Sequence, residues 1–396
     1  MSSSSRYFAP IDFKTRFPAL DGIRALAVTM VFFAHYGGGS HGGHVLRILD
    51  AIRKCGWMGV DIFFVLSGFL ITGILFDTRN DPKFFRRFFA RRTLRIFPVF
   101  YLVFAVLLLL TPIFQYQWRW QHFTFLLYIG NFFANRDFNF YTLVSGNHPS
   151  AVVFLSHLWS LCVEEQFYLL WPIAVWAIRD RVRLLWTAGG ISLCTLLARV
   201  LLLHFHPVFA SRYILRTLVF RLDTLLIGAM LALLLRGPGA DWWQRHCKWA
   251  LAGCGTLVAI LLISSSNPDS PRMLGFGLTV IALASAGLIG ATLRPGSFAF
   301  RLFYLRPLRI MGKYSYGFYI YHLLYSWAWI QFLIFMTQKT HSLAIAGAIS
   351  LTSSFVITFL VSKLSYDLFE VRFLQYKKHF EYDSEVVEHK HAFTTK

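Results

Sequence analysis

The feature that most constrains the fold of this chain is a series of apolar stretches close to the length that spans a bilayer. A helix needs about 20 mostly apolar residues to cross a hydrocarbon core of about 30 Å. With 56% hydrophobic and 15% charged residues, the chain resembles neither a soluble globule nor a disordered protein. We therefore predict an all-α, polytopic membrane protein with about ten transmembrane helices, at residues 22–38, 57–76, 96–114, 157–178, 184–204, 213–235, 249–265, 273–292, 314–337 and 342–364.

The basic residues between these stretches predict the orientation of the chain. Of the 39 lysines and arginines, 28 fall on the side of the N-terminus, nine fall on the opposite side, and two lie within spans. Because cytoplasmic loops are enriched in Lys and Arg, we expect both termini to be cytoplasmic. The same enrichment, together with contacts to anionic membrane lipids, accounts for the net charge of +20, so no nucleic-acid partner is expected.

The spans are expected to form one transmembrane domain at residues 18–370, with cytoplasmic tails at residues 1–17 and 371–396. Residues 115–156 contain an apolar part too short to cross, so we predict that this segment is extracytoplasmic or re-entrant. No internal repeat is visible, which disfavours an inverted-repeat transporter. Five aromatic residues of the segment suit either an interfacial belt or stacking on sugar rings: Tyr116, Trp118, Trp120, Tyr128 and Tyr141.

Ionisable residues in the first two spans are candidates for function, because such groups are costly inside a bilayer. Arg24 and His35 are eleven residues apart, close to three helical turns, so they share one face at a separation of about 16 Å. A hydrogen-bonded packing role is the alternative for His35. Asp61 either orients a histidine or is solvated at its helix N-terminus. The small residues Ser67 and Gly68 indicate close helix packing.

A cluster of arginines interleaved with phenylalanines precedes the third span. An anchor on the cytoplasmic side explains most of it. Five guanidinium groups within ten residues also match the oxygen atoms of a polyphosphate such as that of coenzyme A. The cluster consists of Arg86, Arg87, Arg91, Arg92 and Arg95.

The start of the fourth span combines a histidine with a carboxylate. On a continuous helix His157, Leu161, Glu164 and Tyr168 form one stripe, so Glu164 can orient or balance an imidazole. No metal site is expected, because no further ligand has suitable spacing. Later in the chain, Arg221-Leu222-Asp223 predicts an intramembrane ion pair.

Six motifs occur in order between about residues 18 and 370, and they resemble those of acyltransferase family 3, a family of integral membrane acyltransferases. They are Leu20 to Ala25 with the spacing from Arg24 to His35, Gly59 to Ile71, Arg92 to Pro98, His157 to Leu161 with Glu164 to Tyr168, Arg221 to Asp223, and Tyr314 to Tyr316 with Tyr319 and His322.

This resemblance implies ten helices in a bacterial cytoplasmic (inner) membrane and transfer of an acyl group, commonly acetyl, from cytoplasmic acyl-CoA to a hydroxyl. The acceptor is expected to be an extracytoplasmic or lipid-linked saccharide. We expect a chain without a C-terminal hydrolase-like domain, similar to the single-domain members that act on O-antigens, exopolysaccharides or lipo-oligosaccharides.

The resemblance also implies roles for individual residues. His35 is expected to be the general base, since an imidazole pKa near 6.5 suits that role at neutral pH, with Glu164 or, second, Asp61 as its partner. Acyl-CoA enters as a co-substrate, and no cofactor is expected to stay bound. Its phosphates are expected to contact Arg24, Arg91, Arg92 and Arg95. The acceptor is expected to contact His157, Trp159, Tyr168, Tyr319 and His322.

Three other functions compete with this hypothesis. A secondary transporter of an anionic or acylated solute would use His35 and Glu164 as a proton relay. An acyltransferase acting on an intracellular small molecule would keep the same motifs. A lipid-binding scaffold would leave the placement of His35 and Glu164 unexplained. Consumption of acyl-CoA without a membrane gradient separates the enzymes from the transporter.

Overall fold

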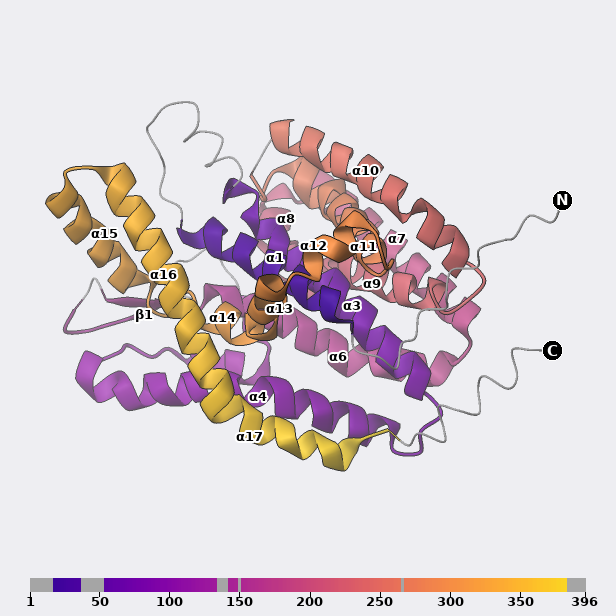
Figure 1. Cartoon of the computed structure of the whole chain (residues 1–396), viewed down its shortest axis with the longest axis horizontal. Helices are drawn as coiled ribbons and strands as arrows, with labels where there is room; N and C mark the ends of the chain where they lie inside the picture. Colours follow the sequence, from indigo (N-terminus) through magenta and orange to yellow (C-terminus); the bar gives the residue numbers. More distant parts are fainter. Residues whose placement is uncertain (1–16, 37–52, 134–141, 149–150, 265–266, 383–396) are drawn as a thin grey trace.

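The computed structural model describes residues 17–36, 53–133, 142–148, 151–264 and 267–382. Within these ranges the chain is almost entirely helical (Figure 1). The long apolar helices are α1 (Pro18–Tyr36), α3 (Gly59–Thr78), α4 (Phe84–Phe114), α6 (Trp159–Ile178), α7 (Arg181–Phe205), α10 (Ala240–Ser264), α11 (Leu278–Thr292) and α16 (Leu343–Ser365). The all-α, polytopic architecture is therefore confirmed.

The described part of the chain contains eight helices long and apolar enough to cross a membrane, or nine if one bent pair counts as a span. The bent pair is α14 (Ser315–Tyr321) and α15 (Ser326–Thr340), and the chain bends by 73° between them. A straight helix over 314–337 was thus the wrong expectation, and His322 lies in the break between the two helices.

The predicted span at 213–235 is also not one helix. Its first residue ends α8 (Pro207–Tyr213), a short turn follows, and only α9 (Leu222–Leu234) is a regular helix. Thirteen residues of helix measure about 20 Å, which is shorter than a hydrocarbon core. Instead α9 is largely buried against α3, α7 and α11.

Glycines let the central helices approach closely. A Cβ atom added at Gly68 of α3 would lie 1.8 Å from the carbonyl oxygen of Leu225 in α9, and one at Gly59 would lie 2.3 Å from that of Ala27 in α1. The backbones of these helices are therefore in direct contact, as small residues allow in membrane helix pairs. The prediction of close packing at Ser67 and Gly68 is confirmed.

Two buried ion pairs join α9 to its neighbours α7 and α3. The Arg199 guanidinium donates two hydrogen bonds of 2.7 Å to the Asp223 carboxylate and a further one to Thr279. Arg221 donates to Asp61 instead. The predicted pairing of Arg221 with Asp223 is thus wrong, because Arg221 ends the turn before α9 while Asp223 lies on its first turn and faces α7.

The segment between α4 and α6 contains α5 (Trp120–Thr124), short 3-10 turns and an antiparallel hairpin of β1 (Thr142–Val144) and β2 (Val152–Phe154) that pairs Leu143 with Val153. Among its aromatic residues, Trp120 is exposed, whereas Tyr116 and Tyr128 are buried. Tyr128 stacks on Phe100 in the core, so packing explains it and sugar stacking does not. Tyr141 lies outside the described residues.

The chain after α16 does not leave the fold at residue 370. It continues through η8 (Tyr366–Glu370), α17 (Val371–Leu374) and η9 (Gln375–Phe380) and packs along α4 (Figure 1). Phe17, at the other end of the described chain, lines the same cavity as Leu374 and Lys377. Both ends of the described chain therefore lie on one side, as predicted.

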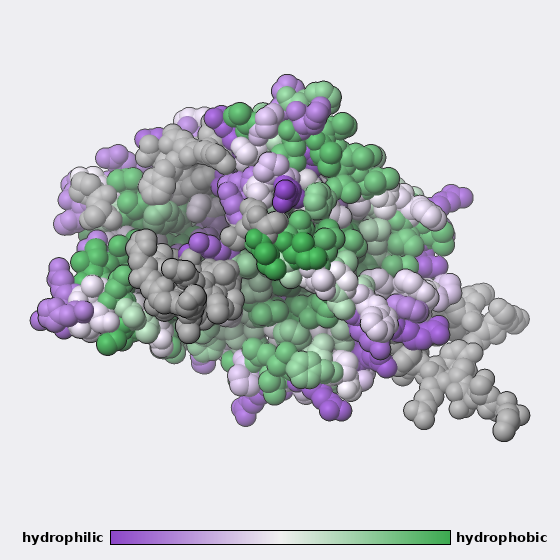
Figure 2. Space-filling view, turned by 90° about the horizontal axis from the view of Figure 1, so that it is seen from above, coloured by the Kyte–Doolittle hydropathy of each residue, from purple (hydrophilic) through white to green (hydrophobic). Residues whose placement is uncertain are grey.

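The outer surface carries many exposed large apolar side chains, among them Leu109, Trp186 and Ile263. Figure 2 shows broad hydrophobic areas on one face, interrupted by hydrophilic groups. Apolar surface on this scale is expected where helices face lipid. The chain is therefore an integral membrane protein.

Candidate active site

A cavity of about 500 Å³, which we call the outer cavity, opens beside the N-terminal end of α1. This volume lies within the range of small-molecule binding sites. Five cationic side chains line it: Arg24, Arg95, Arg236, Lys313 and Lys377. Three carboxylates also line it: Asp21, Asp77 and Glu370.

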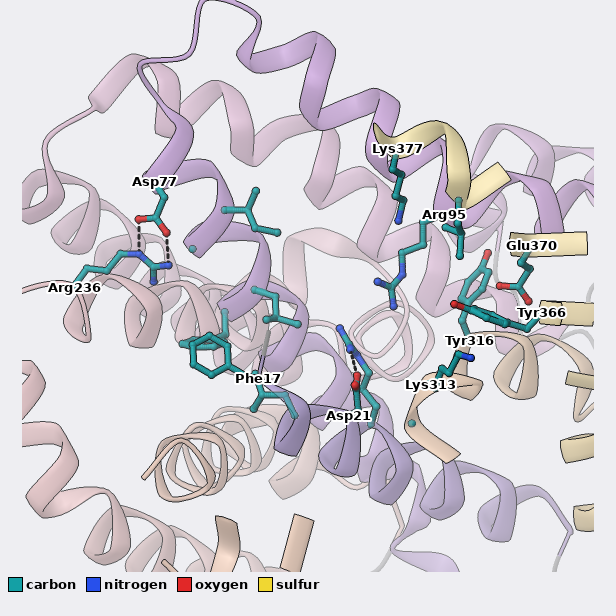
Figure 3. Close-up of a pocket in the computed structure, with 18 residues that line it drawn as sticks. Phe17, Asp21, Asp77, Arg95, Arg236, Lys313, Tyr316, Tyr366, Glu370 and Lys377 are labelled. Carbon is teal, nitrogen blue, oxygen red and sulfur yellow. Dashed lines mark hydrogen bonds and ion pairs between the residues drawn. The ribbon is translucent and has the colours of Figure 1, made fainter. Parts of the chain in front are cut away.

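The charges of the outer cavity are only partly paired. Arg24 bonds to Asp21 at 2.7 Å, and Arg236 bonds to Asp77 at 2.8 and 2.7 Å (Figure 3). Within the described residues, Arg95 and Lys377 form no such ion pair, and Figure 3 shows them next to each other on the wall opposite Arg236. This wall therefore has surplus positive charge and suits an anionic ligand.

A smaller cavity of about 110 Å³, the inner chamber, extends the outer cavity into the helix bundle. Arg24, Leu70, Arg95 and Tyr316 line both cavities, so the two are neighbours along one path. The remaining polar lining of the inner chamber comes from α3, α4, α6 and α14. It comprises Ser67, Arg92, Ser160, Glu164, Tyr168, Ser315 and Tyr319.

Glu164 lies at this chamber beside Ser67 and Tyr168, whose hydroxyls bond to each other. The guanidinium of Arg92 stacks 3.9 Å above the Tyr168 ring, so it balances the carboxylate of Glu164 from the same wall. No described contact joins Glu164 to His35, so the structure does not bring this predicted pair together. His157 belongs to a 3-10 turn (η5, Ser156–Leu158), which breaks the helical stripe that joined it to Glu164.

Three histidines from three separate elements gather beyond the inner chamber. His35, at the end of α1, lies with its Nδ1 atom 2.9 Å from the Val31 carbonyl oxygen and 3.3 Å from Nε2 of His322. The His322 and His157 rings are 5.0 Å apart. His322 and His157 are buried, whereas His35 is exposed. The reactive candidate is therefore the accessible member of a histidine cluster.

Tyr319 connects the inner chamber with this cluster. Its ring lines the chamber, its hydroxyl donates to the His157 carbonyl oxygen at 2.8 Å, and its own carbonyl oxygen lies 2.6 Å from Nδ1 of His322. Ser160 also lines the chamber and bonds to the Tyr319 hydroxyl. One residue layer therefore separates the chamber from the histidines.

Other predicted site residues lie elsewhere. Asp61 is buried against Arg221 and does not contact His35 in the described structure, because the ion pair uses its carboxylate. Arg91 lines neither cavity and donates a hydrogen bond to the carbonyl oxygen of Phe380. Trp159 packs edge to face on Phe64 and lines neither cavity.

Three cationic residues of the outer cavity were not predicted, because distant parts of the chain contribute them: Arg236, Lys313 and Lys377. Lys377 was predicted to belong to a cytoplasmic tail. Only the packing of that segment against the folded domain shows that Lys377 lines the outer cavity. Among the described residues, no group of three or more metal-ligating side chains is arranged to hold a metal ion.

Fold and cavities together define a polytopic membrane protein in which a cation-rich cavity leads from one side toward a histidine cluster. The chain belongs to acyltransferase family 3, since it matches the family's acyltransferase domain over residues 17–365.

Its relatives carry related names. YrhL of Bacillus subtilis (strain 168), provisionally named a peptidoglycan O-acetyltransferase, is 31% identical. OatA of Staphylococcus aureus, named an O-acetyltransferase, is 28% identical, and OatA of Listeria monocytogenes, named a peptidoglycan O-acetyltransferase, is 30% identical. Each match covers 77% of this chain and 48–50% of the relative, so the chain spans about half the length of these curated relatives. The comparison with solved structures found no match.

Proposed function

We propose that the protein is a membrane-bound O-acyltransferase that moves an acetyl group from cytoplasmic acyl-CoA to a hydroxyl of a saccharide. The observation that carries this proposal is the path from the outer cavity through the inner chamber to Tyr319, which contacts both His157 and His322. The family and the names of the relatives support the chemistry.

The outer cavity suits the donor. Acyl-CoA carries three phosphate groups at its nucleotide end and the thioester at the other end of a thin pantetheine arm. Arg95 and Lys377, which form no close ion pair among the described residues, would contact the phosphates. The narrower inner chamber, with walls from Val60, Phe63 and Leu66, suits the arm.

Transfer requires a base and no permanently bound group. His35 would take the proton of the acceptor hydroxyl as its oxygen attacks the thioester carbon. The new carbon–oxygen bond forms, the carbon–sulfur bond breaks, and the thiolate of CoA receives the proton back from the imidazolium. An acyl-imidazole formed briefly on His35 is the two-step version of the same exchange.

The acceptor would reach His35 from the face opposite the outer cavity. Arg24 lies at the cavity, while His35 lies eleven residues further along α1, about 16 Å away along the helix axis. The donor and the acceptor would therefore enter at opposite ends of the bundle, and only the acyl group would cross. A bacterial cytoplasmic membrane, with acyl-CoA inside and saccharides outside or lipid-linked, provides this arrangement.

Purified protein in detergent tests the proposal. We expect consumption of acetyl-CoA that depends on a saccharide acceptor such as a peptidoglycan fragment or a lipid-linked oligosaccharide, and we expect its loss in His35→Ala by a factor of about 10² to 10⁴. Turnover without a membrane gradient would exclude the transporter. Absence of acetyl-CoA consumption with every acceptor class, or full turnover by His35→Ala, would contradict the proposal.

A further inference from the structure

The histidine cluster contains a hydrogen-bond chain with a defined direction. His322 lies in the break between α14 and α15, with its Nδ1 atom 2.6 Å from the Tyr319 carbonyl oxygen. A carbonyl oxygen only accepts hydrogen bonds, so Nδ1 of His322 carries the proton. In a neutral ring, the Nε2 atom of His322 is then an acceptor.

The same reasoning applies one step further along the chain. Nδ1 of His35 lies 2.9 Å from the Val31 carbonyl oxygen and 3.3 Å from Nε2 of His322, and both of these atoms are acceptors. Nδ1 of His35 therefore carries the proton and shares it between them. The lone pair of His35 is left on Nε2, the nitrogen that faces away from His322.

The surroundings keep His322 in place. Tyr36 of α1 donates its hydroxyl proton to the backbone carbonyl of His322, and the His157 ring, which bonds through Nε2 to the Ile320 carbonyl oxygen at 2.9 Å, packs against the His322 ring. Within the described residues, no carboxylate contacts any of the three rings. A neutral imidazole thus occupies the place that Asp or Glu often takes beside a catalytic histidine.

We infer that His322 is a positioning residue for the transfer reaction: its Nε2 atom accepts the Nδ1 proton of His35, which turns the His35 Nε2 lone pair toward the acceptor hydroxyl. This inference rests on the proposed function and deepens it. When His35 takes the acceptor proton, the imidazolium retains the same bond to His322, so the charged intermediate state is stabilised without a buried carboxylate.

Two amide substitutions test the inference because they differ in which nitrogen of the ring they replace. In His322→Gln the amide oxygen lies near the position of the native Nε2 atom, so it can accept the hydrogen bond from His35. In His322→Asn the shorter side chain reaches only the position of the native Nδ1 atom. We expect His322→Gln to retain kcat within about 10-fold, and His322→Asn and His322→Met to lose about 10²-fold. The KM for acetyl-CoA should stay unchanged in all three, because the outer cavity is intact.

Tyr325→Phe is the matched control, since Tyr325 bonds to Thr358 in the same helix break but belongs to neither cavity. It should retain wild-type turnover, and thermal unfolding should report similar stability for all variants. Equal kcat in His322→Met and wild type, or equal losses in His322→Gln and His322→Asn, would overturn the role of His322 while leaving the transferase itself intact. Lack of activity in the wild-type protein would instead overturn the proposed function.

Discussion

Two groups of charged residues lie within this helix bundle, and they differ in pairing and in access. The first, the closed ion-pair cluster, consists of Arg199, Asp223, Arg221 and Asp61, which are at most 1% exposed and which pair as two cations with two carboxylates. The second, the outer cavity, has five cations, three carboxylates and open volume. An ionisable residue inside a membrane protein therefore indicates function when it faces a cavity and remains partly unpaired, and indicates structure when its partners are complete.

The difference also explains why the sequence alone left the role of Asp61 open. From its position near the start of a span it suited both a catalytic and a structural role. Its partner, Arg221, lies 160 positions later in the chain, and no local pattern links the two. Asp61 belongs to the closed ion-pair cluster and therefore stabilises the contact of α3 with α9.

The largest expected effect comes from opening the closed cluster. Asp223→Ala leaves Arg199 buried without its carboxylate, which costs about 3 to 5 kcal/mol and should greatly reduce the yield of folded protein and its unfolding temperature in detergent. The control is Asp367→Ala, which removes an exposed pair with Lys363 and should leave stability unchanged.

A double variant sharpens this test. The variant that combines Arg199→Leu with Asp223→Met removes the unpaired buried charge. It should recover much of the stability lost in Asp223→Ala. If Asp223→Ala unfolds at the wild-type temperature, the closed cluster does not stabilise the bundle and the contrast between the two regions fails.

A smaller effect, on one substrate only, is expected in the outer cavity. Arg95→Glu should raise the KM for acetyl-CoA by about 10- to 100-fold with a much smaller change for the acceptor, since one or two charge-assisted bonds to phosphate are lost. Arg86→Glu is the matched control, because Arg86 is exposed on the same helix and lines neither cavity. Steady-state kinetics with each substrate varied in turn measures both values. Equal increases in both variants would mean that the arginine cluster acts through topology.

The smallest expected effect is on the KM for acetyl-CoA when one of two neighbouring lysines is replaced. Both lysines lie in the segment that follows the family domain. Lys377 lines the outer cavity and Lys378 is exposed outside it. Lys377→Gln should raise the KM for acetyl-CoA about 3- to 10-fold, and Lys378→Gln should not change it. Titration of binding with desulfo-CoA would give the same order of affinities. Identical values for the two variants would remove the C-terminal segment from the donor site.

Much of the architecture could be predicted from the sequence because the dominant signal, hydrophobic length, is local. Eight of the predicted spans correspond to long apolar helices. In the two remaining predicted spans the helix is broken, because tertiary contacts override the apolar pattern. One example is the bend between α14 and α15, which contains His322.

The candidate site was only partly predictable for a related reason. Arg24 and His35 share one helix, so helical geometry related them correctly. The contact of His35 with His322 joins α1 to the break after α14, and the cavity wall at Lys377 joins α4 to the end of the chain. Such long-range contacts depend on packing, which hydrophobic periodicity does not encode.

The central claim is that donor and acceptor enter at opposite ends of the bundle, and sealed vesicles of known orientation test it most directly. Acetyl-CoA supplied only on the side of the outer cavity, with a saccharide acceptor only on the other side, should give acetylated product, and reversing the two compartments should give none. Product formed only when both substrates share the compartment of the outer cavity would contradict transfer across the membrane and would favour an intracellular small-molecule acceptor.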